Sequence, residues 1–283
     1  MENKKVWFVT GASKGLGLTL VKKLLSKGYQ VAATSRNLND LSTAVGEMDN
    51  FLPLAVNLMD ENSVEEAIGQ TITKFGKLDV VVNNAGYGMI GALEELTDAE
   101  SRANFDVNVF GSLNVIRKAL PQMRKQQSGH VFNISSIGGF SGNFPGFGIY
   151  CATKFAVAGF TESLAAEVQS FGIKATVVEP GYFRTDFLTS GSLAVPQHPI
   201  DAYQSVRDTQ AAHQHDINNQ QPGDPAKAAD VMIAAAESDS APLHLFLGPD
   251  AYQVADAKIA DVQKDMVAWK TLATSTNFDA VEV

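Results

Sequence analysis

Two side chains suited to acid–base chemistry, Tyr150 and Lys154, lie four residues apart in the run IYCATKFAVAGFTESLAAEV. Residues four apart on a helix share one face, so the phenol and the ammonium can approach each other. A free tyrosine has a pKa of about 10, and a nearby ammonium lowers that pKa because it favours the phenolate. The pair therefore predicts a tyrosine that donates or accepts a proton near neutral pH, as a general acid or base does.

Other polar residues could take part in the same chemistry. Ser135 and Ser136 end the apolar run HVFNIS and precede a glycine-rich stretch. A hydroxyl there can hold a substrate carbonyl oxygen against the tyrosine, or it can cap the end of a strand. Asn108, in FDVNVFG, falls within a predicted helix. Its amide serves either as a structural bond to a neighbouring strand or as part of a proton relay.

The stretch TGASKGLG at 10–17 predicts an anion site. It follows the apolar run KVWFVT and leads into LGLTLVKKLLSKG, which has leucines at helical spacing. The unpaired N–H groups and the positive end of a helix then face one point, and Gly11, Gly15 and Gly17 allow a phosphate to contact the backbone. Such turns also occur for packing reasons, so the stretch alone does not establish that an anion binds there.

The elements that position these residues alternate between strand and helix patterns. Strands are expected at 5–10, 29–35, 51–56, 78–86, 130–135, 173–181 and 244–248, and helices at 16–28, 60–75, 98–127, 149–171 and 250–272. Pro121 predicts a break or kink in the third helix. The alternation predicts a doubly wound, mainly parallel seven-stranded α/β sheet, Rossmann-like, with helices on both faces in a single domain over 1–283. Ligands bind such sheets at the carboxyl ends of the strands.

The region 182–225 is rich in Gln, His, Asn and Ser and has no clear strand pattern, which predicts a substrate loop or lid. Aromatic residues flank the tyrosine in the sequence. Some are expected in the core and others in an apolar substrate cleft. The substrate contacts expected on this basis, together with Ser136, are Phe140, Phe144, Tyr182 and Phe187.

Composition excludes several classes of function. A net charge of −9 without a basic cluster argues against nucleic-acid binding. The single cysteine, Cys151, excludes an internal disulfide. His213 and His215 lie two apart, which is poor geometry for a metal, and no metal site is expected. The charged N-terminus and the lack of a long apolar run predict a cytoplasmic protein with neither signal peptide nor membrane span.

The stretches TGASKGLG, NNAG (83–86), Asn108, Ser136, YCATK and PGYFRT occur in the order found in the short-chain dehydrogenase/reductase family. Over about its first 190 residues the chain resembles the compact branch, whose glycine spacing is G-x-x-x-G-x-G, and not the epimerase-like branch with G-x-x-G-x-x-G. Its C-terminal part resembles bacterial hydroxysteroid and retinol dehydrogenase-like oxidoreductases. The resemblance also implies a homo-oligomer, a dimer or tetramer.

The resemblance implies a role for each matching residue. Tyr150 is the catalytic acid or base, and Lys154 holds the nicotinamide ribose and lowers the tyrosine pKa. Ser136, a better candidate than Ser135, orients the carbonyl, and Asn108 links Lys154 to solvent through water. The cofactor contacts expected from the patterns and the resemblance together are Gly11, Ser13, Lys14, Gly15, Leu16, Gly17, Ser35, Arg36, Asn57, Leu58, Asn84, Ala85, Gly86, Tyr150, Lys154, Pro180, Gly181, Phe183 and Thr185.

The end of the second strand favours NADP(H) over NAD(H). An NAD site usually has an acidic residue there for the ribose 2′-hydroxyl. This chain has Ser35 followed by Arg36, and Lys14 adds a cation in the glycine turn. Asn57 stands where the family often has an aspartate at the adenine.

The leading hypothesis is an NADP(H)-dependent carbonyl reductase or alcohol dehydrogenase with a fairly hydrophobic small-molecule substrate. A non-catalytic NADP(H)-sensing protein is the alternative from another class, although a sensor has no need of the Tyr–Lys pair. A nucleotide-sugar isomerase or dehydratase is disfavoured by the glycine spacing.

Overall fold

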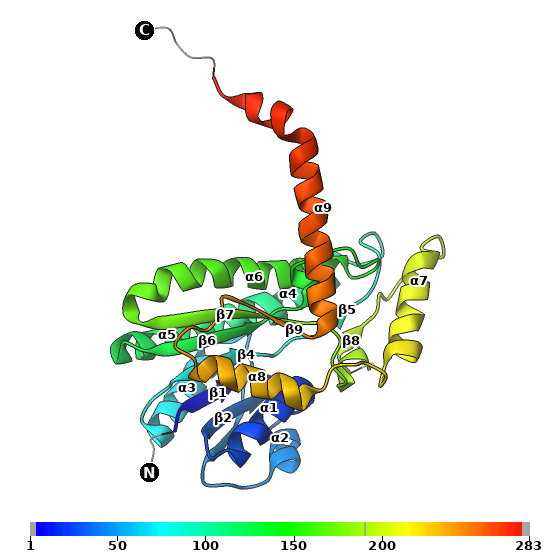
Figure 1. Cartoon of the computed structure of the whole chain (residues 1–283). Coiled ribbons are helices and arrows are strands. Elements are labelled where there is room, and N and C mark those ends of the chain that lie inside the picture. The colour runs from blue at the N-terminus through cyan, green and yellow to red at the C-terminus, as the bar shows by residue number, and fades with distance from the viewer. Residues whose placement is uncertain (1–3, 190, 279–283) are drawn as a thin grey trace, which may run out of the picture.

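The computed structural model describes residues 4–189 and 191–278, and a parallel sheet forms its centre (Figure 1). The seven strands have the order β3-β2-β1-β4-β6-β7-β9, and all neighbours run parallel. The strands are β1 (Val6–Val9), β2 (Gln30–Ser35), β3 (Phe51–Ala55), β4 (Val80–Asn83), β6 (Gly129–Ile134), β7 (Ile173–Pro180) and β9 (His244–Leu247). The predicted doubly wound, Rossmann-like α/β sheet is thus confirmed.

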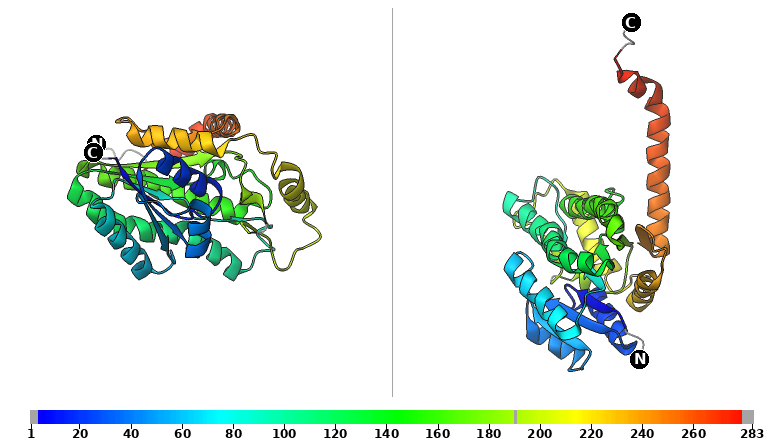
Figure 2. Two further views of the ribbon diagram at one scale, coloured as in Figure 1. Left: turned by 90° about the horizontal axis from the view of Figure 1, so that it is seen from below. Right: turned by 90° about the vertical axis from the view of Figure 1, so that its left-hand side faces the viewer.

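Helices cover both faces of the sheet, as Figure 2 shows. Successive strand residues point to opposite faces, so Trp7 lies in the core under one helix layer and Phe8 in the core under the other. The first layer contains α1 (Gly15–Ser26), α2 (Leu38–Val45) and α8 (Pro225–Glu237). The second contains α3 (Glu61–Phe75), α5 (Gly111–Gln126) and α6 (Gly148–Val168). Burial on both faces explains the uninterrupted apolar strands.

The helical tract predicted over 98–127 is irregular, but not where Pro121 predicted. It consists of α4 (Asp98–Phe105), a π-helical turn over Asp106–Phe110, and α5, which continues through Pro121. The helix therefore does not break at Pro121, and the alternative of a kink there stays a prediction. Proline removes the bond to the carbonyl four residues earlier, and Arg117 and Pro121 both lie on the exposed side, where water can bond that carbonyl.

The region 182–225 contains more regular structure than its sequence suggested. A two-residue strand, β8 (Leu193–Ala194), pairs with β5 (Gly88–Met89), and α7 (Gln204–Ala211) lies beyond it, at the side of the sheet (Figure 1). These elements are too short to leave a periodic pattern in the sequence. Whether the region acts as a lid remains a prediction.

The last long helix, α9 (Pro249–Ala273), starts beside β9 and extends away from the rest of the molecule (Figures 1 and 2). Its bounds differ by one residue at each end from those of the helix expected at 250–272. No helix within the described residues is both long and apolar enough to cross a membrane.

Candidate active site

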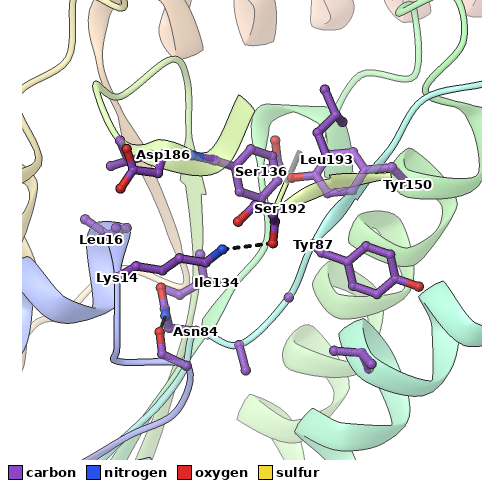
Figure 3. A pocket seen from close by; sticks show the side chains of 18 of the residues that line it. Lys14, Leu16, Asn84, Tyr87, Ile134, Ser136, Tyr150, Asp186, Ser192 and Leu193 are labelled. Carbon is purple, nitrogen blue, oxygen red and sulfur yellow. Dashed lines mark hydrogen bonds between the residues drawn. The ribbon is translucent and has the colours of Figure 1, made fainter. Parts of the chain in front are cut away.

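A cavity of about 1020 Å³ lies at the carboxyl ends of the strands. Its walls come from the β1–α1 turn, the ends of β2, β4, β6 and β7, the first turns of α6, and the segment after β7. Figure 3 shows Lys14 and Leu16 on one side of this cavity and Tyr150 on the other. The carboxyl edge of the sheet therefore brings the glycine turn and Tyr150 to the same cavity.

The glycine turn forms one end of the cavity. Gly11 and Gly15 have φ angles of +64° and +59°, a region that favours glycine. Helix α1 begins at Gly15 with no side-chain hydrogen bond at its N-cap and no acidic residue in its first turn. Its first N–H groups therefore remain available to an anion beside the cavity.

The NNAG stretch braces this turn from behind. Asn84 Nδ2 donates to the carbonyls of Thr10 and Gly11, both at 2.9 Å. A Cβ on Gly17 would lie 2.4 Å from Asn84 Nδ2, so Gly17 is needed for this packing. Gly17 is not among the residues that line the cavity, and its expected direct contact with a cofactor is corrected to a supporting position.

The predicted chemical residues meet at the other end. The Oγ of Ser136 accepts from the N–H of Gly138 at 3.0 Å and caps the following turn. The same hydroxyl lies close enough to Tyr150 to lower the pKa of that phenol. Lys154 Nζ donates to the carbonyl of Ile134 at 2.9 Å and lies 5.7 Å from the centre of the Tyr150 ring. The hydroxyl of Ser135 instead donates to the carbonyl of Lys154 at 2.8 Å. Of the two uses considered for a serine at this strand end, Ser136 shows the cap, and its contact with a substrate carbonyl stays a prediction.

Burial controls the proton affinities of this pair. The pKa of Tyr150 is raised, chiefly because burial disfavours the phenolate, and the nearby Ser136 hydroxyl only partly offsets this effect. Burial also lowers the pKa of Lys154 to about 8. The pKa of Tyr150 is thus raised where Lys154 was expected to lower it, because the cost of burying the phenolate decides the direction.

Asn108 lies in the π-helical turn and joins three elements. Its Oδ1 accepts from the N–H of Tyr87 at 3.0 Å, and its Nδ2 donates to the carbonyl of Tyr87 at 3.0 Å and to Thr153 Oγ1 at 3.1 Å. A Cβ on Gly86 would lie 3.0 Å from Asn108 Oδ1 and 3.6 Å from Lys154 Nζ. The side chain of Asn108 thus holds the end of NNAG against α6.

The residues that were expected to favour NADP(H) have distinct environments. The hydroxyl of Ser35 donates to the carbonyl of Asn37 at 2.9 Å, whereas Arg36 is exposed at the cavity wall. Lys14 Nζ donates to the carbonyl of Gly191 at 2.8 Å (Figure 3), and Asn57 Oδ1 accepts from the N–H of Met59 at 3.2 Å. The other expected cofactor contacts that line the cavity are Ser13, Leu16, Leu58, Ala85, Pro180, Gly181, Phe183 and Thr185.

Beyond Tyr150 the cavity wall is aromatic. Phe144, Tyr182 and Phe187 line it as expected, but Phe140 does not. Phe140 packs edge-on against Phe246, with 5.2 Å between ring centres, near the base of α9. Its expected substrate contact is therefore wrong, because Phe140 faces the outer helix.

Sequence reasoning missed several residues of this wall, and the clearest case is His213. Its Nδ1 lies 2.8 Å from the carbonyl of Thr209, and its Nε2 lies 2.8 Å from the hydroxyl of Tyr182. A carbonyl only accepts, so Nδ1 carries the proton and Nε2 accepts from Tyr182. Burial also lowers the pKa of His213, which favours this neutral ring. No sequence signal joins two residues this far apart in an irregular region. The other lining residues that were missed include Tyr87, Phe147, Cys151, Leu188, Leu193 and Gln221.

The sequence matches the short chain dehydrogenase family over residues 5–194, which include every residue of the Tyr–Lys–Ser–Asn set. The chain belongs to the short-chain dehydrogenase/reductase family. It is similar to oxidoreductase BOA17 of Botryotinia fuckeliana, with 36% identity over 274 residues that cover 96% of this chain and 99% of that protein. It is also similar to the 3-ketodihydrosphingosine reductase of Bacteroides thetaiotaomicron, with 39% identity over 190 residues, 67% of this chain and 68% of that one. This short-chain dehydrogenase/reductase is therefore an oxidoreductase.

Solved structures agree with this assignment. A short-chain dehydrogenase from Streptomyces avermitilis superposes with a TM-score of 0.89 at 37% identity, covering 98% of this chain and all of that one. The enzyme ElxO with NADP bound gives a TM-score of 0.71 at 29% identity, covering 86% and 97% of the two chains. Neighbours at 24% and 22% identity, solved in complex with NADH and with NAD, share the fold.

Proposed function

We propose that this short-chain dehydrogenase/reductase is an NADP(H)-dependent carbonyl reductase or alcohol dehydrogenase with a fairly hydrophobic substrate, and that Tyr150 is its general acid and base. The observation that carries the proposal is the shared cavity, in which the glycine turn at one end and Tyr150, Ser136 and Lys154 at the other line one space.

The residues present fit a dinucleotide. The uncapped start of α1 offers N–H groups and a positive helix end to a phosphate, and no acidic side chain of its first turn opposes it. The cavity of about 1020 Å³ is at the upper end of the roughly 300–1,000 Å³ typical of small-molecule sites. When bound, the nicotinamide supplies or accepts the hydride.

In this proposal the chain supplies orientation and the proton. The Ser136 hydroxyl holds the substrate oxygen beside the Tyr150 hydroxyl, whose pKa the same serine lowers. Tyr150 gives its proton to the forming alkoxide in reduction and takes it back in oxidation. The raised pKa of Tyr150 keeps the phenol protonated, which suits the reductive direction. Lys154 holds ribose hydroxyls with its buried ammonium.

The choice of NADP(H) rests on Arg36. Arg36 lines the cavity and its side chain is exposed. The preceding residue, Ser35, stands where an NAD site has a carboxylate, and that carboxylate would repel a 2′-phosphate. The aromatic wall of Phe144, Phe147 and Phe187 supports a substrate with an apolar body.

The test is turnover of purified protein with NADPH and a panel of apolar ketones and aldehydes. Tyr150→Phe should lower kcat by about 10²–10⁴-fold while NADPH still binds in calorimetry. The matched control is Tyr203→Phe, because the Tyr203 hydroxyl bonds Glu94 away from the cavity wall. Full activity of the Tyr150→Phe variant would refute the acid–base role. Tight NADPH binding without turnover of any carbonyl compound would favour the NADP(H)-sensing alternative.

A further inference from the structure

Helix α9 carries a continuous apolar stripe with alternating spacings of three and four residues. The stripe is formed by Tyr252, Ala255, Ile259, Val262, Met266 and Trp269. This is the seven-residue repeat of helices that pack along their length against another helix. It runs for about 26 Å at 1.5 Å per residue.

Among residues 4–189 and 191–278, only those around the base of this stripe cover it. Ala251 and Ala255 are buried in a small cluster with Ile137. Farther out, every residue from 259 to 278 is exposed; Met266 is 67% and Trp269 64% exposed. Isolated helices are marginally stable in water and depend on packing of their apolar face, so this stripe calls for a partner.

The inner end of the stripe borders a groove against α6. The groove has a volume of about 420 Å³, and Ile259 and Val262 form its α9 side. Phe155 and Gly159 of α6 form the opposite side, and Phe155 is itself exposed. Gly159 leaves open space at its position, so another helix can approach α6 closely there.

We propose that α9 is an association arm that pairs with α9 of a second copy of this chain, antiparallel, across a two-fold axis. The line of contact between the two helices, here called the seam, then places Tyr252 on Trp269 of the second copy, Ala255 on its Met266, and Ile259 on its Val262. The small Ala255 thus faces the large Met266 of the second copy. The second helix also fills the groove beside Phe155. An antiparallel arrangement also places the two bodies at opposite ends of the seam.

Charge complementarity identifies the occupant as a second copy. In this register Lys258 lies on the same edge of the seam as Asp265 of the second copy, and symmetry repeats that pair. Over its length α9 has four aspartates and three lysines, and the chain has a net charge of −9. An acidic protein with an acidic arm is repelled by anionic lipid surfaces, which disfavours a membrane as the covering surface.

The first test measures molar mass by light scattering during gel filtration of the full-length protein. Met266→Asp places a charge inside the seam, costs nothing in the single copy because Met266 is exposed, and should raise the dissociation constant on the order of 100-fold or more. Its molar mass should be half that of the wild-type protein. Val267→Asp is the matched control. It adds the same charge one residue along, at a side chain that is 78% exposed and lies off the stripe, and should keep the wild-type mass.

The second test exchanges the charged pair. Lys258→Glu or Asp265→Lys alone should weaken association through like-charge contacts, and the double variant should restore it. A monomeric wild-type protein, equal masses for Met266→Asp and wild type, or no rescue by the double exchange would overturn the proposal. So would sedimentation of the wild-type protein, but not of Met266→Asp, with vesicles of mixed anionic and zwitterionic lipid, because α9 would then be a lipid-binding helix.

Discussion

Replacing Lys154 by methionine should change the stability of the protein in a pH-dependent way. Burial lowers the pKa of Lys154 from 10.5 to about 8. With about 1.4 kcal/mol for each tenfold change in proton affinity, the charged form costs the folded state about 3 kcal/mol. Methionine removes this cost and fills a similar volume, but it leaves the Ile134 carbonyl without its donor, a loss of about 1 kcal/mol.

The pH window follows from linkage. Because the folded-state pKa lies below the unfolded value, the unfolded chain binds more protons between pH 8 and 10.5, and the stability of the wild type rises over this range. Below pH 8 the full cost is present. The Lys154→Met variant should therefore be about 2 kcal/mol more stable than wild type at pH 7, and about 1 kcal/mol less stable at pH 10.5.

Urea unfolding of both proteins at the two pH values measures this difference, without added cofactor. The contributions of all other titrating groups cancel between variant and wild type. An equal difference in unfolding free energy at pH 7 and pH 10.5 would show that the ammonium is not buried in the free protein. The variant should also lose most of its activity, which provides a separate check on the proposed ribose contact.

Two further predictions concern the cofactor end. Arg36→Ala should weaken NADPH binding about 10- to 100-fold and leave NADH binding nearly unchanged, because a charge-assisted bond to phosphate contributes about 1.5–3 kcal/mol. Calorimetry with both cofactors measures the two affinities. Equal losses of affinity for NADPH and NADH would contradict the phosphate contact. Gly11→Ala should destabilise the protein by about 2–4 kcal/mol, because its Cβ would lie 2.6 Å from Ala85 Cα in addition to the unfavourable φ. Gly28→Ala is the control, because Gly28 also has a positive φ, +80°, but nothing lies within 4 Å of an added Cβ. Thermal or urea unfolding of this variant should show a loss of stability of only about 1 kcal/mol. Similar losses for both variants would argue against the close approach of Gly11 to Ala85.

Much of the fold followed from local patterns. Strands buried on both faces are continuous apolar runs, and strand–helix alternation restricts the chain to a parallel, right-handed arrangement. All seven predicted strands of the main sheet are present for this reason. The break expected at Pro121 does not occur, because a rule based on local sequence does not take into account whether the carbonyl that loses its hydrogen bond faces water.

Local sequence is enough to show that Tyr150 and Lys154 share a helix face and that the glycine turn opens a helix, since both depend on neighbours within a few residues. The surroundings of these residues depend on how distant segments pack. Burial, a property of the whole assembled cavity, reverses the expected change in the Tyr150 pKa and lowers that of Lys154. Likewise, long-range packing turned Phe140 toward α9, brought His213 to Tyr182, and left the stripe of α9 exposed. Contacts between residues far apart in the sequence carry no periodic signal, so local patterns could not reveal them.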